Sequence, residues 1–185
     1  MAEPQRRTLM DAARVEGVLA RMAEEIVHLT AGGSGLLLVG VERRGVQLAA
    51  RLADLLRART GAAPLTGSLD ITLYRDDLMT VGPRPVVGQT RLPVGGIDGR
   101  QLVIVDDVLY TGRTVRAALD ELADFGRPKR ILLAVLVDRG GRELPIQGDV
   151  VGERVQVEEG GRVEVLVPEL DGSLGVELVG AEGGA

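Results

Sequence analysis

Three short apolar segments constrain the fold of this chain more than any other feature of its sequence. They are Leu36–Val41, Leu102–Val105 and Ile131–Val137, and helix-like patterns lie between them. A strand that is apolar at every position is typical of a parallel sheet covered by helices on both faces, because a solvated face would place polar residues at alternate positions. Strands of this kind alternating with helices predict an α/β fold with a parallel sheet and right-handed crossovers.

Turn residues bound the predicted helices and separate the remaining strands. Asp11 is a suitable N-cap for the first helix, and Gly126 and Pro128 end the third. Helices are expected around residues 15–26, 46–56 and 112–125, and a further strand over 68–74. Beyond Asp149, alternating segments at 155–157, 163–167 and 176–179 are broken by glycine pairs. They predict antiparallel hairpins, either at an edge of the main sheet or in a small subdomain.

Composition excludes several classes of function. The 185 residues suit one domain, residues 1–185, and their cysteine count of 0 excludes disulfides and thiol chemistry. A single histidine, His28, excludes a multi-histidine metal site. Aromatic residues make up 2% of the chain, too few for a platform that stacks bases. No apolar run reaches the roughly 18 residues of a membrane span, so no membrane association and a cytoplasmic location are expected.

The net charge of −5 is unevenly distributed. Residues 1–59 carry nine arginines against seven acids, residues 60–145 are balanced, and residues 146–185 carry two arginines against nine acids. The chain is therefore not a generally basic nucleic-acid binder, although a local basic face in the first half is compatible with these counts.

The segment from Leu102 to Thr114 carries the clearest chemical signal. A buried strand is followed by Asp106 and Asp107, and then by Thr-Gly-x-Thr leading into a helix. Free N–H groups at a helix N-terminus bind phosphate, and Gly112 allows the backbone to come close. The two carboxylates would repel that phosphate, so they suit sugar hydroxyls or a magnesium ion held through water. A phosphate beside a diol describes a ribose 5-phosphate. The alternative is that these residues only cap a helix.

This segment resembles the phosphoribosyl-pyrophosphate motif of the type I phosphoribosyltransferases. It is most similar to the bifunctional family of pyrimidine operon attenuators that are also uracil phosphoribosyltransferases. Three further segments carry the narrower resemblance: Val39–Gly45, Leu69–Asp77 and Leu136–Ile146. Together the four segments extend the resemblance over about residues 14–170.

The resemblance implies transfer of a phosphoribosyl group from phosphoribosyl pyrophosphate to uracil, giving UMP and pyrophosphate with Mg²⁺. It places the ribose hydroxyls and the indirect metal contact at Asp106 and Asp107, and the pyrophosphate at a loop of Arg43, Arg44 and Gly45. Arg43 departs from the usual Thr of the family. Asp106, Asp107 and Arg44 are the expected catalytic residues. The phosphoribosyl group is expected on Asp106, Asp107, Val108, Leu109, Tyr110, Thr111, Gly112, Arg113 and Thr114.

The resemblance also implies parts that close the site. Uracil is expected against Asp138 and Arg139, with Val163 in a small hood built mainly from about 138–170. A flexible flap is expected at about 78–92, from which Arg84 is a candidate to reach the pyrophosphate. A homodimer or a larger homo-oligomer is expected from the family alone.

The second activity of that family is binding of pyrimidine operon leader mRNA in response to UMP or UTP. Arg21, Arg142 and Arg154 are the candidate phosphate contacts here. The usual hydroxyl, His, His and Lys of the family are replaced by Ala20, Glu24, Gly141 and Glu153. An acid in place of a base loses an attraction to phosphate and adds a repulsion. Two alternatives therefore stay open: an enzyme that has lost RNA binding, and a phosphoribosyltransferase for another nucleobase.

Overall fold

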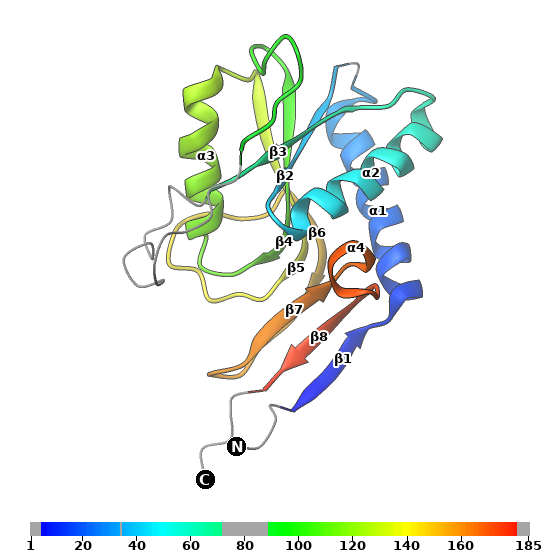
Figure 1. Ribbon diagram of the computed structural model, residues 1–185, viewed down its shortest axis with the longest axis vertical. Coiled ribbons are helices and arrows are strands. Elements are labelled where there is room, and N and C mark those ends of the chain that lie inside the picture. Colours follow the sequence, from blue (N-terminus) through cyan, green and yellow to red (C-terminus); the bar gives the residue numbers. More distant parts are fainter. Residues whose placement is uncertain (1–4, 34, 72–88, 181–185) are drawn as a thin grey trace.

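The fold is built around a five-stranded parallel sheet, seen in a computed structural model that describes residues 5–33, 35–71 and 89–180 (Figure 1). The strand order is β3-β2-β4-β5-β6. Their bounds are Leu37–Val41 for β2, Leu65–Leu69 for β3, Gln101–Leu109 for β4, Arg130–Asp138 for β5 and Val150–Arg154 for β6. Every pairing in this sheet is parallel, as the apolar runs predict.

Helices cover both faces of this sheet. Alternate residues of each strand point to opposite faces, so Leu38 packs in one apolar cluster and Leu37 in the other. Helix α1 (Ala12–Thr30) and helix α2 (Arg44–Thr60) cover the first face, and helix α3 (Arg113–Phe125) covers the second (Figure 1). The N-cap expected at Asp11 is confirmed, since its carboxylate accepts the N–H of Arg14 at 2.8 Å.

A second, antiparallel sheet of order β1-β8-β7 lies beside the carboxyl ends of the main strands (Figure 1). It consists of β1 (Arg6–Met10), β7 (Arg162–Leu166) and β8 (Gly175–Val179), with the short helix α4 (Pro168–Asp171) between the last two. Arg6 of β1 links the three strands by ion pairs, to Glu164 of β7 at 2.7 Å and to Glu177 of β8 at 2.8 Å. The antiparallel segments thus form a separate unit, one of the two arrangements that the sequence left open.

Three expectations about individual strands were wrong. The strand expected at 68–74 is β3, which begins and ends earlier, and residues 72–88 lie outside the described residues. The strand before the acid pair continues to Leu109, so Asp106 and Asp107 lie inside β4 instead of following it. The first hairpin segment, 155–157, is not a strand, and β6 before it joins the main sheet in parallel. The sequence analysis did not foresee β1.

The strand order places a topological switch point between β2 and β4. From β2 the chain crosses to β3 on one side, and from β4 it crosses to β5 on the other. Loops at the carboxyl ends of two such strands diverge and leave a crevice where ligands bind. Among the described residues, no helix is long and apolar enough to cross a membrane.

Candidate functional site

Two carboxylates stand at the carboxyl end of β4. Asp106 is 6% exposed and accepts the N–H of Asp107 at 2.9 Å, while Asp107 accepts the N–H of Val108 at 2.8 Å. Burial raises the pKa of Asp106 well above its ordinary value, and the neighbouring charge of Asp107 raises it further. Asp107 is only partly buried, so it is the more accessible of the two acids.

The loop between β4 and α3 has the form of a phosphate cradle. Gly112 has a φ of 93°, and a Cβ there would press against Leu144 and Ile146 at 3.3–3.4 Å. Both its conformation and its surroundings therefore favour glycine. Helix α3 begins directly after it, so the first free N–H groups of the helix face the space beyond the loop. The Thr111 hydroxyl accepts the N–H of Arg113 at 3.2 Å.

The segment after β5 supports this cradle from outside. The N–H groups of Glu143 and Leu144 donate to the carbonyl of Thr111 at 3.0 and 3.1 Å. Glu143 also pairs with Arg113 at 2.7 Å. Sequence reasoning missed Glu143, because nothing in its neighbourhood indicates which loop it will contact.

Arg43, Arg44 and Gly45 follow β2, directly across the switch point from the acid pair. Gly45 lies against β4, and a Cβ there would clash with the carbonyl oxygen of Val105. The peptide bond between Glu42 and Arg43 is cis. Arg43 is exposed, whereas Arg44 is partly buried and turns toward the second sheet.

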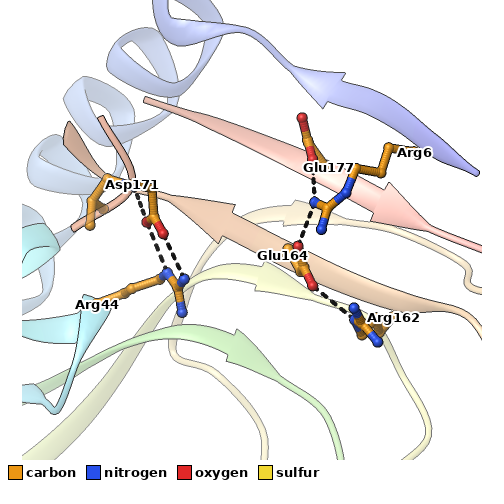
Figure 2. A network of polar contacts seen from close by, with 7 residues as sticks. Arg6, Arg44, Arg162, Glu164, Asp171 and Glu177 are labelled. Atoms are coloured by element: carbon orange, nitrogen blue, oxygen red, sulfur yellow. Dashed lines mark hydrogen bonds and ion pairs between the residues drawn. The ribbon is translucent and has the colours of Figure 1, made fainter. Parts of the chain in front are cut away.

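Arg44 is held by a residue that sequence reasoning missed. Its Nε and Nη2 donate to the two carboxylate oxygens of Asp171 in α4, at 3.2 and 2.9 Å (Figure 2). These bonds raise the pKa of Arg44, and the charge of Asp107 adds a smaller increase. Asp107 therefore lies within electrostatic reach of Arg44.

The residues expected to contact the base lie after β5 and in the second sheet. The N–H of Arg139 donates to the carbonyl of Leu109 at 3.1 Å, and its guanidinium lies 4.0 Å from the centre of the Tyr110 ring. Its buried Nε has no partner among the described residues. Asp138 pairs with Arg142 at 2.5 Å. Val163 lies on β7 and is partly buried against the core.

The three arginines expected to contact RNA gather around β6. Arg154 ends this strand, and Arg21 donates to the carbonyls of Val151 and Gly152. Arg142 and Arg154 line one open cleft of about 660 Å³ together with Asp138. Arg142 is already engaged inside the protein: besides Asp138, it donates to the carbonyls of Tyr110 and Ile146, both at 2.8 Å.

These placements bring most of the expected site together. The acid pair, the loop 110–114, the loop 43–45 and the start of the segment after β5 meet at one end of the sheet. Arg84 and residues 78–88 of the expected flap lie outside the described residues. Of the remaining residues 89–92, Arg91 forms a backbone bridge to Ser68 of β3.

The acid pair alone is too small a donor set for a site made of protein groups only, but it could hold a magnesium ion together with water and substrate oxygens. In the described ranges, no group of three or more His, Asp or Glu is arranged to hold a metal ion. One oxygen of each carboxylate already accepts a backbone N–H. Mg²⁺ keeps several waters and commonly binds through one or two carboxylates together with phosphate oxygens of the substrate, which this donor set allows.

An acid pair at a switch point, followed by a loop with the form of a phosphate cradle, is the arrangement expected of a phosphoribosyltransferase. The chain belongs to the phosphoribosyltransferase family. The phosphoribosyl transferase domain model matches residues 6–166. Within this family the chain belongs with the bifunctional PyrR proteins. It is 53% identical over 175 residues to the bifunctional protein PyrR of Thermus aquaticus, covering 95% of this chain and 96% of the relative. It is 49% identical to that of Mycolicibacterium paratuberculosis, covering 93% of this chain and 92% of the relative.

Solved structures show the same fold at low sequence identity. A hypoxanthine-guanine phosphoribosyltransferase from Bacillus anthracis has a TM-score of 0.73 at 16% identity and covers 96% of this chain and 99% of its own. A hypoxanthine phosphoribosyltransferase from Trypanosoma cruzi has a TM-score of 0.71 at 19% identity, with 95% of both chains covered. Together with the family match, the architecture makes this chain a phosphoribosyltransferase, an enzyme that transfers a pentosyl group.

Proposed function

We propose that this protein transfers the phosphoribosyl group of phosphoribosyl pyrophosphate to uracil, forming UMP and pyrophosphate. The observation that carries the proposal is the convergence, at one switch point, of a phosphate cradle, an acid pair and an arginine. The cradle 110–114 would hold the 5-phosphate, Asp106 and Asp107 the ribose hydroxyls, and Arg44 the pyrophosphate.

The reaction needs positioning more than it needs a nucleophile in the protein. The bond from ribose C1 to the pyrophosphate oxygen breaks, a bond from C1 to uracil N1 forms, and the N1 proton is lost. The transition state resembles an oxocarbenium ion, so donors placed at the departing pyrophosphate lower the barrier. Bound Mg²⁺ would neutralise part of the pyrophosphate charge. Arg44 supplies a planar fork that suits pyrophosphate oxygens.

The segment after β5 would select the base. The N–H of Arg139 and the carbonyl of Asp138 are already bonded within the protein, to Leu109 and Val155. The base would therefore be held by the side chains of this segment, with Val163 offering an apolar contact. Burial would raise the pKa of Asp138, but hydrogen bonds from Arg142 and from the N–H of Gly140 outweigh it and lower the pKa. Asp138 is therefore charged near neutral pH, and its side chain serves the loop through Arg142.

A panel of bases tests this proposal. The protein with phosphoribosyl pyrophosphate and Mg²⁺ is incubated with uracil, cytosine, hypoxanthine or guanine, and the nucleotide product is measured by chromatography. We expect UMP from uracil and no comparable product from the other three. Faster conversion of hypoxanthine would replace uracil by a purine in the proposal, and the absence of any product would contradict the phosphoribosyl transfer itself.

The proposal includes the second activity of the bifunctional proteins, namely binding of pyrimidine operon leader RNA in response to UMP or UTP. Its support is the group of Arg21, Arg142 and Arg154 around β6. Acids are interspersed in this group, since Glu153 pairs with Arg14 at 3.1 Å and Asp138 pairs with Arg142. RNA phosphates would compete with these carboxylates, so we expect weak binding that falls further as the salt concentration rises.

A filter-binding titration with a leader RNA at several salt concentrations, with and without UMP, tests this part. Nucleotide-dependent binding that weakens with salt supports it, and its absence at low salt leaves the enzyme as the whole function. Light scattering of the same samples measures the proposed homo-oligomer. A cytoplasmic location belongs to the same proposal and agrees with a cysteine count of 0.

A further inference from the structure

Arg44 uses only one edge of its guanidinium within the protein. The edge formed by Nε and Nη2 faces Asp171, at 3.2 and 2.9 Å. The other edge, formed by Nη1 and the second N–H of Nη2, has no hydrogen-bond partner in the described parts of the chain. In Figure 2 this edge points away from Asp171. A guanidinium can bind two anions in this way, one along each edge, because its five N–H groups lie in one plane.

Asp171 is itself fixed in place. Its Oδ2 accepts the N–H of Val167 at 2.9 Å, and its own N–H donates to the carbonyl of Val167 at 2.7 Å. Val167 is fully buried. The hydrogen bond from Arg44 lowers the pKa of Asp171 most, and the bond from the N–H of Val167 lowers it further. The carboxylate is thus charged near neutral pH and attached to a rigid turn.

The position of Arg44 relative to the acid pair is set at both ends. Gly45 packs against the backbone of Val105 and Asp106, which fixes the start of α2 against β4. Asp171 then fixes the far end of the side chain. A long side chain held at both ends loses little conformational entropy when a ligand binds, and this improves binding.

We infer that Asp171 is a positioning residue for phosphoribosyl transfer: by occupying one edge of the Arg44 guanidinium it presents the opposite edge to the pyrophosphate group. The inference rests on the proposed function, since it takes Arg44 as the pyrophosphate arginine. It assigns a role in substrate binding to α4, the short helix between β7 and β8, which lies outside the four segments that carry the family resemblance.

Two physical effects of removing the carboxylate have opposite signs, which makes the inference testable. A negative charge near a pyrophosphate site repels the substrate, so Asp171→Asn should lower the KM for phosphoribosyl pyrophosphate if charge alone matters. Loss of positioning should raise it. We expect the KM, and the Kd measured by calorimetry without any base, to rise about tenfold, as befits one misplaced charge-assisted contact. The KM for uracil should not change.

A second ion pair between the same two helices provides the matched control. Arg51 of α2 pairs with Glu169 of α4 at 3.3 Å. Glu169→Gln removes a charge from the same short helix and should leave both constants unchanged. Asp171→Glu, which restores a carboxylate, should recover most of the affinity. Melting temperatures of all variants report whether they are folded, and Arg44→Lys, which keeps the charge but loses the fork, replaces Asp171→Asn if that variant does not fold.

Several outcomes would overturn the inference. An unchanged or lower KM in Asp171→Asn would show that the carboxylate does not position Arg44. An equal loss in Glu169→Gln would show a general loosening of α4. The proposed function fails separately: wild-type protein that neither binds phosphoribosyl pyrophosphate nor forms a nucleotide contradicts it, whatever the variants do.

Discussion

The two parts of the site that we propose bind anions are assembled in opposite ways. The phosphate side, Asp106 to Thr114, consists of nine consecutive residues in which one strand passes into one helix. The pyrophosphate side joins Arg44 to Asp171, which are 127 residues apart. The first part is therefore specified by local sequence, whereas the second exists only when the second sheet is packed against the first.

The comparison predicts the largest loss of activity on the phosphate side. Asp106→Asn combined with Asp107→Asn should reduce turnover by about 10³-fold or more, because both acceptors for the ribose hydroxyls lose their charge. Steady-state rates with uracil measure the loss, and circular dichroism checks the fold. Asp120→Asn, on the exposed side of α3, is the matched control and should retain full activity. Wild-type rates in the double variant would remove the acid pair from the site.

A smaller loss is expected on the pyrophosphate side. Arg44→Ala should lower kcat/KM for phosphoribosyl pyrophosphate by about 100-fold, since a charged fork contributes to the binding of the leaving group. Arg51→Ala, further along the same helix α2, controls for the loss of a positive charge. Arg43→Ala should have a minor effect because Arg43 is exposed. If Arg43→Ala proves more harmful than Arg44→Ala, the two arginines exchange roles.

The smallest effect concerns stability and has the opposite sign to the loss of activity. The pKa of Asp106 is raised in the folded protein, so the folded state binds more protons than the unfolded state above about pH 4. Its ionisation therefore lowers stability as pH rises from there through the folded-state pKa. Asp106→Asn should increase the free energy of unfolding by about 1 kcal/mol at neutral pH, with the gain shrinking toward pH 4.

Urea unfolding at pH 4 and pH 7.5 measures this change. The single variant should be more stable and less active than the wild type, as expected for a buried charge that is kept for function. A loss of stability at pH 7.5 would indicate that the ionised form of Asp106 stabilises the fold, which would contradict the raised pKa.

The central strands and the phosphate side could be predicted from the sequence for a physical reason. Strands β2, β4 and β5 lie inside the sheet. Because both of their faces are buried, each of them has a continuous run of apolar residues. Asp106 to Thr114 similarly follow one another in the order in which they are used. In both cases the local sequence pattern predicts the same structure that the folded chain adopts.

The edges of both sheets could not be predicted in the same way. Within the described residues, strand β3 pairs with β2 on one side and forms a single bridge, from Ser68 to Arg91, on the other. Leu65 and Thr66 are exposed, so the beginning of the strand has no apolar signature. Strand β1 carries Arg6, whose partners Glu164 and Glu177 lie far along the sequence. Asp171 was missed for the same reason, since no local spacing relates it to Arg44.

The pairing of β1 with β8 also has a consequence for how the chain is made. Arg6 faces Val179 in this pair, so β1 stays unpaired during synthesis until β8 has been made. At roughly 5–20 residues per second this takes on the order of ten seconds. During that time β1 is an unpaired strand. We expect the positive charges of Arg6 and Arg7 to disfavour its pairing with a strand of another nascent chain. Synthesis of β7, α4 and β8 then completes the second sheet and brings Asp171 to Arg44, so we expect substrate binding to mature only after β8 has been made.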